Sequence, residues 1–138
     1  MSATSNGVIQ FNGYRLLQMK YECAASFSPM IGENGNYHIN MGNGFQEMAD
    51  NSVQINLMIN VFFNETEDNE TAPLKAVVEL AGKFIMQDHS KWNHQFDSNA
   101  IAILYPYARA ILSSVTAQSG RDPIILPTVN IVALLSQK

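Results

Sequence analysis

Strict alternation of apolar and polar residues marks two neighbouring segments of this chain as strands. Between residues 52 and 63, apolar side chains take every odd position and amides most of the even ones (Val53, Ile55, Leu57, Ile59, Val61 and Phe63 against Gln54, Asn56 and Asn60). Residues 74–86 repeat the alternation, with Gly82 inside the apolar row. A period of two means that one face of each strand lies on a core. Only the acidic segment 65–71 separates the strands, so they are predicted to form an antiparallel hairpin.

Two further strands are predicted in the first third of the chain. Residues 8–23 have one row of mostly apolar side chains (Arg15, Leu17, Met19, Tyr21 and Cys23) and a more polar row between them (Leu16, Gln18, Lys20 and Glu22). Asn12-Gly13 predicts a kink or bulge near the start of this strand. A loop rich in helix and strand breakers covers residues 26–36. Tyr37, Ile39 and Met41 then alternate with polar residues, which predicts a short half-polar strand.

The last third of the chain has the period of a helix. Its apolar residues follow i, i+3, i+4, i+7 spacing (Ile101, Leu104, Tyr105, Ala108, Ile111, Leu112 and Val115). Asp97 or Ser98 is expected to cap the start and Gly120 to end the helix, while Pro106 predicts a kink. Ile103, Tyr107 and Ala110 form a second apolar face, which requires a second packing partner besides the sheet, such as a neighbouring subunit.

An extended connector is expected over residues 122–127, and a short terminal helix over residues 130–136. The predicted fold is therefore α+β: a four-stranded antiparallel β-sheet with one long and one short C-terminal helix on one face, in a single domain over residues 1–138.

Composition narrows the classes of function. Charged residues are only 14% of the 138 residues, where about 25% is usual, so the surface is unusually neutral and favours association. A net charge of −4 without a basic stripe argues against nucleic-acid binding. No apolar run is expected to reach the roughly 20 residues of a membrane span, and residues 1–7 do not resemble a signal peptide. With a single cysteine, these features predict a cytosolic protein without membrane insertion.

Candidate catalytic and metal-binding groups are sparse. Cys23 paired with a histidine would make a nucleophile, but it sits in the apolar row of its strand, where cysteine acts as a small hydrophobe. His89 and His94 lie five residues apart, a spacing that does not place both on one face of a helix, so no metal site is expected. The acidic run over residues 65–70 lacks the ligand spacing of a calcium loop. Neither a cofactor nor a catalytic residue is predicted.

The remaining candidates for a functional site are apolar and aromatic side chains. The chain has seven methionines, and Phe27 and Met30 lie in the loop with many breakers, where a core is hard to build. Methionine suits surfaces that accept many partners. An apolar groove beneath this loop is the more specific hypothesis. A compact pocket for a small hydrophobic ligand is the alternative, although no polar groups are seen to converge on it.

The string Leu104-Tyr105-Pro106-Tyr107-Ala108-Arg109 resembles a Leu-Phe-Pro-Tyr-Ala-Arg string at the start of the main helix in the SecB export chaperones. The order of the surrounding features also resembles that family. Gly120, Pro123 and Pro127-Thr128-Val129-Asn130-Ile131 follow the helix, with one residue inserted before Asn130. Upstream, Met48-Ala49-Asp50 and Gly82-Lys83-Phe84 match family features around the two long strands. The resemblance covers about residues 11–135.

The resemblance implies a chaperone that holds unfolded or export-bound polypeptides and passes them to the SecA motor, without ATP, metal or enzymatic activity. It implies a homotetramer, a dimer of dimers, with Ile103, Tyr107 and Ala110 at a subunit interface. It also implies long apolar grooves for the client, made by the loop, the second strand and the terminal helix. The residues at the corresponding positions are Phe27, Met30, Tyr37, Ile39, Met41, Ile131, Leu134 and Leu135.

Two departures concern SecA. The family docks SecA through acidic residues on the exposed sheet face, where this chain has Lys20, Lys75 and Val77. The chain also stops at Lys138 without the family's C-terminal tail. SecA is therefore the partner that the sequence supports least. A SecB-like chaperone dedicated to one partner, such as an antitoxin, is the alternative, since some proteins of that kind read Leu-Tyr-Pro-Tyr at the same helix.

Overall fold

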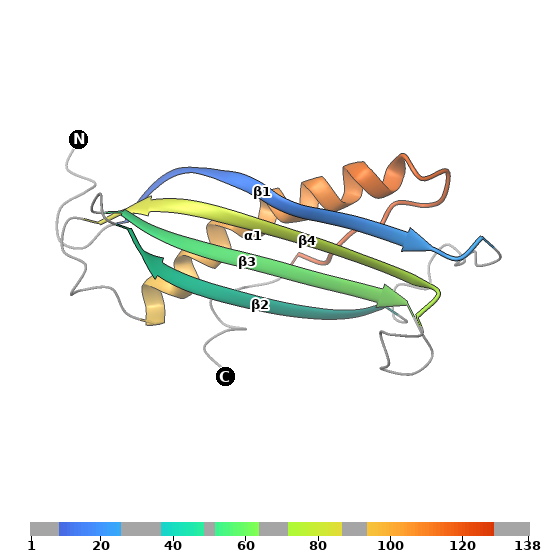
Figure 1. Ribbon diagram of the computed structural model, residues 1–138, viewed down its shortest axis with the longest axis horizontal. Coiled ribbons are helices and arrows are strands. Elements are labelled where there is room, and N and C mark those ends of the chain that lie inside the picture. Colours follow the sequence, from blue (N-terminus) through green and yellow to red (C-terminus); the bar gives the residue numbers. More distant parts are fainter. Residues whose placement is uncertain (1–8, 26–36, 49–51, 64–71, 87–93, 129–138) are drawn as a thin grey trace.

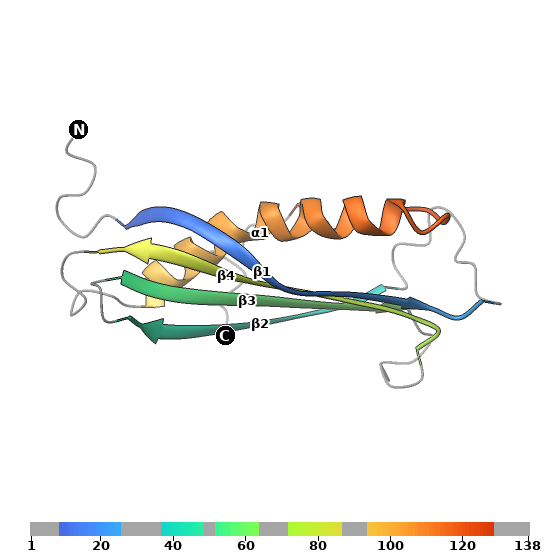
Figure 2. The ribbon, with the colours of Figure 1, turned by 45° about the horizontal axis from the view of Figure 1, so that its top comes forward.

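Four antiparallel strands form one sheet, and one long helix covers one of its faces (Figure 1 and Figure 2). The computed structural model describes residues 9–25, 37–48, 52–63, 72–86 and 94–128. The elements are β1 (Gln10–Cys23), β2 (Tyr37–Glu47), β3 (Ser52–Phe63), β4 (Leu74–Ile85) and α1 (His94–Ala117). The strand order is β1-β4-β3-β2, so β1 and β2 form the edges of the sheet. The predicted α+β class and four-stranded antiparallel sheet are confirmed.

The hairpin of β3 and β4 is the centre of the core, as the alternation predicts. In the register Leu57 faces Leu80 and Ile59 faces Val78, and all four side chains are almost fully buried. The odd positions of β3 point toward α1, whereas Gln54 and Asn56 lie on the outer face, where Gln54 Nε2 donates a 2.9 Å hydrogen bond to Asn56 Oδ1. The amides thus satisfy one another at the surface away from the helix.

Strand β1 departs from the predicted alternation because it contains two bulges. The first lies between Phe11 and Tyr14, where Gly13 has a φ of 94°, as Asn12-Gly13 predicts. A second bulge lies between Leu16 and Gln18 and was not predicted. The predicted assignment of two β1 residues to faces is therefore wrong. Leu16 pairs with the core residue Leu80 and shares the inner face with Met19, whereas Arg15 lies on the outer face.

Helix α1 begins at His94, earlier than the predicted caps Asp97 and Ser98, and runs without interruption past Pro106 to Ala117. Figure 2 shows that its direction changes about halfway along, as a proline inside a helix predicts. Gly120, just beyond its end, has the left-handed φ of 84° expected of a helix stop.

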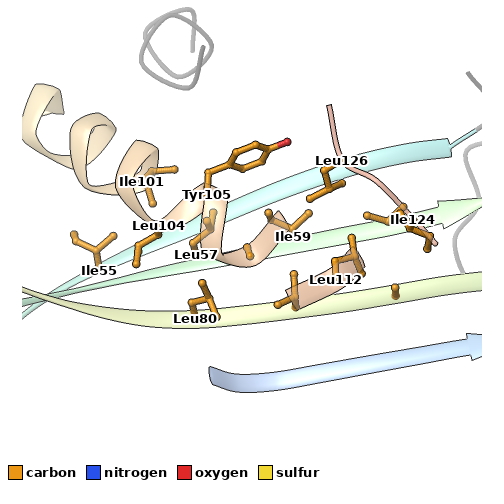
Figure 3. Close-up of a cluster of buried hydrophobic side chains, with 14 of the residues drawn as sticks. Ile55, Leu57, Ile59, Leu80, Ile101, Leu104, Tyr105, Leu112, Ile124 and Leu126 are labelled. Carbon is orange, nitrogen blue, oxygen red and sulfur yellow. The ribbon is translucent and has the colours of Figure 1, made fainter. Parts of the chain in front are cut away.

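Contrary to the expectation from sequence, Phe96–Ala117 is long and apolar enough by composition to span a membrane. A helix packed in the core of a soluble protein meets the same criterion. Here the apolar residues Ile101, Leu104 and Leu112 are buried against the sheet (Figure 3). Ala108 is buried as well.

The helix packs close to the sheet at a position where β4 has no side chain. A Cβ at Gly82 would lie 2.7 Å from Cδ2 of Leu104. Gly82 therefore lets α1 approach the sheet directly. The described residues contain one helix; the short helix predicted over residues 130–136 lies outside them.

Candidate functional site: a groove between the edge strand and the connector

After α1 the chain turns back as an extended connector, residues 121–128, which runs along the helix (Figure 1). Its side chains alternate in burial: Ile124 is 3% exposed, Ile125 58% and Leu126 1%. Every second residue thus enters the core while Ile125 points outward. A single exposed aliphatic side chain is common on protein surfaces, so Ile125 is informative only together with the apolar residues that lie beside it.

A stripe of polar side chains on α1 holds the connector in place. Ser113 Oγ donates to the carbonyl of Ile124 at 3.0 Å, and the amide of Ile124 donates to Thr116 Oγ1 at 2.8 Å. Arg109 Nε donates to the carbonyl of Leu126 at 2.6 Å. Tyr105 Oη donates to the carbonyl of Pro127 at 2.6 Å. In Figure 3 the ring of Tyr105 extends from α1 toward the connector.

These four residues fall on one side of the helix because their spacing is i, i+4, i+8, i+11. Thr116 is fully buried and also donates to the carbonyl of Leu112 at 2.7 Å, so its hydroxyl is used as both donor and acceptor. The connector is therefore fixed through its backbone, which leaves the side chain of Ile125 available at the surface.

A groove of about 370 Å³ separates the connector from the inner face of β2. We call it the connector groove; its lining is mainly apolar (Tyr37, Ile39, Val61, Arg109, Ile124, Ile125, Leu126 and Pro127). The ring of Tyr37 packs edge-on against Phe63, with centroids 5.2 Å apart. Ile39 is 39% exposed beside it. The groove thus presents aliphatic and aromatic surface from two extended segments.

The two tyrosines near the groove have phenols that resist ionisation. Burial raises the pKa of Tyr37, and the neighbouring Tyr21, Cys23 and Asp122 raise it further. Burial also raises the pKa of Tyr105, an effect that the Arg109 guanidinium partly opposes. Tyr105 therefore stays protonated and able to donate to Pro127 throughout the neutral range.

The structure brings together part of the predicted client site. Tyr37 and Ile39 line the connector groove. Met41 lies further along the same face of β2, paired with Ile59, and is not among the lining residues. The predicted Phe27, Met30, Ile131, Leu134 and Leu135 lie outside the described residues. Sequence reasoning missed Ile124, Ile125, Leu126 and Arg109, although three consecutive apolar residues between two prolines were a signal for them.

Strand β2 is longer than predicted and forms an edge of the sheet. It runs to Glu47, and its inner row continues past Ile39 to Phe45, which is 44% exposed. Within the described residues β2 pairs with β3 alone. An edge strand presents backbone amides and carbonyls that an added strand can use.

A second apolar surface lies at the opposite edge of the sheet. The ring of Tyr107 packs against Tyr14 and Phe11 of β1, at centroid distances of 4.7 and 5.7 Å, yet it is still 40% exposed. Ile103 is half-buried and Ala110 is exposed. The predicted second face of the helix is therefore partly covered by β1 of the same chain.

The candidate nucleophile Cys23 and the candidate metal ligands were also considered in the sequence, and the structure describes part of them. Cys23 pairs with Leu74 in the register and packs against the core, and its thiol donates to the carbonyl of Ala24 at 3.6 Å. Among the described residues no three His, Cys, Asp or Glu side chains are grouped to hold a metal ion. His89 lies outside those residues.

The family model described as "Preprotein translocase subunit SecB" matches residues 18–138, nearly the whole sheet, α1 and the connector. The chain belongs to the SecB family. This SecB-family protein is 32% identical over 81 residues to an uncharacterised protein of Methanocaldococcus jannaschii; the match covers 57% of this chain and 52% of that protein. The chain thus spans about half the length of that relative.

The SecB-family fold is also found by structural comparison. A SecB-like chaperone of Mycobacterium tuberculosis, solved in complex with a ChAD peptide from an antitoxin, superimposes with a TM-score of 0.62. The two chains are 18% identical over 88% of this chain and 90% of the other. The resemblance read from the helix string and its surroundings is confirmed, and so is the SecB-like fold.

Proposed function

We propose that this SecB-family protein is an ATP-independent holdase that binds unfolded polypeptides in the connector groove. The observation that carries the proposal is the groove itself, an apolar channel between an edge strand and an exposed, backbone-anchored connector. Membership of a chaperone family and the chaperone identity of the structural neighbour support a role in binding polypeptides. The whole chain, residues 1–138, acts as one domain in this proposal.

The chemistry of the groove fits an extended client. Ile39 and Ile125 flank it from opposite sides and are 39% and 58% exposed. Burial of a large aliphatic side chain contributes roughly 1.5–3 kcal/mol. A client strand alongside β2 satisfies its backbone by pairing with the edge while alternate side chains enter the groove. Such binding selects apolar segments without requiring a particular sequence, as a holdase must. In this proposal it uses no nucleotide, metal or cofactor.

The charge of the outer sheet face bears on whether the protein serves general export or one dedicated partner. A general role in export would include hand-off to SecA, but Lys20 and Lys75 lie on the outer face, paired with Val77 and Glu22. The peptide bound by the mycobacterial neighbour comes from an antitoxin. A chaperone dedicated to one aggregation-prone partner is therefore the second candidate function, in the same cytosolic compartment and with the same groove.

The proposed assembly is a homotetramer, a dimer of dimers. Ile103, Tyr107 and Ala110 lie at a subunit interface in this proposal. The exposed 40% of Tyr107 and the neighbouring Leu16, 47% exposed on the inner face of β1, supply apolar area for it. Association would lengthen the binding surface by bringing grooves from several copies together.

Light scattering of an aggregating model protein, with this protein at a few-fold excess, tests the holdase. The wild type is expected to suppress aggregation. The double variant Ile39→Ser, Ile125→Ser should require at least about tenfold more protein for the same effect, because two aliphatic contacts are lost at once.

Leu17→Ser is the matched control, since Leu17 is 47% exposed on β1 at the other edge of the sheet. It should act as the wild type does. No suppression by the wild type, or equal weakening by the control, would contradict the groove assignment. A pull-down from the native host then separates the two client classes: one dominant partner supports the dedicated chaperone, and many partners support the general holdase.

A further inference from the structure

Among the described residues that line the connector groove, Arg109 is the one with a charged side chain. The others are aliphatic or aromatic residues and Pro127. Arg109 is half-buried, in contrast to Arg15, which is exposed on the outer face of the sheet. A cation among apolar side chains needs polar partners, because a charge that loses its water without one is costly.

One hydrogen bond orients the guanidinium of Arg109. Its Nε donates to the carbonyl of Leu126 at 2.6 Å, and Leu126 itself is buried. The guanidinium is also close enough to Tyr105, one helical turn earlier, to oppose the rise that burial causes in the pKa of that phenol. Because the guanidinium is planar and is held at Nε, the direction of its two terminal nitrogens is restricted as well.

The two terminal nitrogens of Arg109 carry donors that the protein does not use. Within the described part of the chain, Arg109 makes the bond to Leu126 and no ion pair. Asp122 is the acidic residue of the connector, but it precedes Leu126 by four residues of extended chain, roughly 13 Å. A guanidinium has five N–H groups, so the four on Nη1 and Nη2 remain for a ligand in the groove.

A client in the groove would change the surroundings of these donors. A segment that covers the groove removes water from Arg109, so a wholly apolar segment leaves the charge without a partner. A carboxylate accepts two parallel hydrogen bonds from Nη1 and Nη2 and carries the opposite charge, which compensates for the lost water. The groove should therefore favour a client that brings one carboxylate.

The alternation of an extended client sets where that carboxylate must stand. Alternate side chains of a strand point to the same face, so those that enter the groove are two residues apart. Ile39 on β2 and Ile125 on the connector offer exposed aliphatic surface within the same groove as Arg109. An acidic residue with apolar residues two positions before and after it therefore matches both kinds of surface.

We propose that Arg109 is a specificity-determining residue of the connector groove, which prefers apolar client segments that carry one acidic side chain among their inward-pointing residues. This inference rests on the proposed function of the groove. Nη1 and Nη2 of Arg109 bind the client carboxylate end-on, while the apolar neighbours of the acidic residue contact Ile39 and Ile125. The preference separates clients of equal apolarity by a single charge.

Fluorescence anisotropy with two labelled peptides tests the preference. In both, serine and leucine alternate over 11 residues, the length of β2, and both ends are blocked. The central leucine is replaced by glutamate in one peptide and by glutamine in the other. At neutral pH the wild type should bind the glutamate peptide at least about fivefold more tightly, because only the glutamate peptide pairs with the charge of Arg109.

Three variants assign the preference to Arg109. Arg109→Gln should bring the affinity ratio of the two peptides close to one while the glutamine peptide still binds. Arg109→Lys should keep only part of the ratio, because lysine has the charge without the planar pair of donors. Arg15→Gln is the matched control: it removes the same charge from the outer face and should keep the full ratio. Thermal unfolding verifies that each variant is folded.

The affinity ratio is a readout that a merely structural role of Arg109 would not move. A proportionate loss of both peptides in Arg109→Gln would therefore overturn the inference and mean that the side chain only supports the connector. Equal wild-type binding of the two peptides would also overturn it, while the groove would remain a client site. Binding of neither peptide would contradict the proposed function, and this inference with it.

Two further arms locate the carboxylate. The glutamine peptide with an unblocked C-terminus should bind no more tightly than its blocked form; affinity equal to that of the glutamate peptide would make a C-terminal carboxylate the ligand instead. The double variant Ile39→Ser, Ile125→Ser should weaken both peptides and preserve their ratio. Unchanged binding of the glutamate peptide by this variant would place the carboxylate outside the groove and contradict the assignment.

Discussion

At the scale of single residues, the string that resembles the SecB helix has a structural explanation. Leu104 and Ala108 are fully buried against the sheet, while Tyr105 and Arg109 donate hydrogen bonds to backbone carbonyls of the connector. One turn of helix thus supplies both the core contact and the anchors of the groove wall. The hydrogen bonds go to backbone carbonyls, so the connector can vary in sequence while its position is held.

Tyr105→Phe removes one of these anchors without changing the shape of the ring. We expect the free energy of unfolding to fall by about 1 kcal/mol at neutral pH, because the Pro127 carbonyl loses its donor. Urea unfolding followed by circular dichroism measures the loss. Tyr107→Phe, on the exposed side of the helix, is the control and should lose less. Equal stability of Tyr105→Phe and the wild type would mean that the bond does not anchor the connector.

The same bond predicts a dependence on alkaline pH. The pKa of Tyr105 is raised above its ordinary value of 10 in the folded state, so the phenol keeps its proton there longer than in the unfolded chain. Its contribution is complete below about pH 10 and is lost as pH rises through the raised pKa. The stability difference between the wild type and Tyr105→Phe should therefore narrow above pH 10 in unfolding curves measured from pH 8 to 11. A constant difference would contradict this role of the hydroxyl proton.

At the scale of elements, the packing of α1 on the sheet depends on one missing side chain. Gly82 lies in the apolar row of β4, and the Leu104 side chain occupies the space where a Cβ would be. Leu104 is 0% exposed, so it has no room to move aside. A glycine weakens a strand by itself, but here it lets the helix and sheet pack directly.

Gly82→Ala should reduce the free energy of unfolding by about 1–3 kcal/mol, the usual cost of overpacking a filled core. The measurement is denaturant unfolding, with the groove assay run in parallel. Gly42→Ala on β2 is the matched control, because a Cβ there meets nothing within 4 Å. It should leave stability unchanged or raise it slightly, by about 0.4–1 kcal/mol. Equal effects of the two substitutions would mean that Leu104 does not depend on the glycine.

At the scale of the whole molecule, apolar and charged side chains lie on different faces of the sheet. Both edges of the inner face keep apolar side chains at the surface, Ile39 and Phe45 on β2 and Leu16 and Tyr107 at the β1 side. The outer face holds the amides of β3 and the charges of β1 and β4. Three surfaces are thus chemically distinct: the mainly apolar connector groove, the apolar edge beside β1, and an outer face that carries amides and charges.

Tyr107→Glu should split the proposed oligomer. Burying a carboxylate in an apolar interface without a partner costs several kcal/mol, enough to dissociate the assembly at micromolar concentration. Light scattering coupled to size exclusion measures the mass. Asn40→Glu, exposed on the outer face of β2, is the control and should leave the mass unchanged. A monomeric wild type would contradict the interface.

The sequence by itself determined the hairpin of β3 and β4, the long helix, its kink at Pro106 and the order of features typical of SecB. These depend on local period and on proline and glycine geometry, which act within a few residues. Only the tertiary structure decided which face of β1 holds Leu16, because a bulge depends on the register with β4. It also decided the connector groove, since Arg109 and Tyr105 hold Ile125 beside Ile39 only after the helix, the connector and the edge strand have packed together. Side chains distant in sequence come together through pairing and packing, and no local pattern records that.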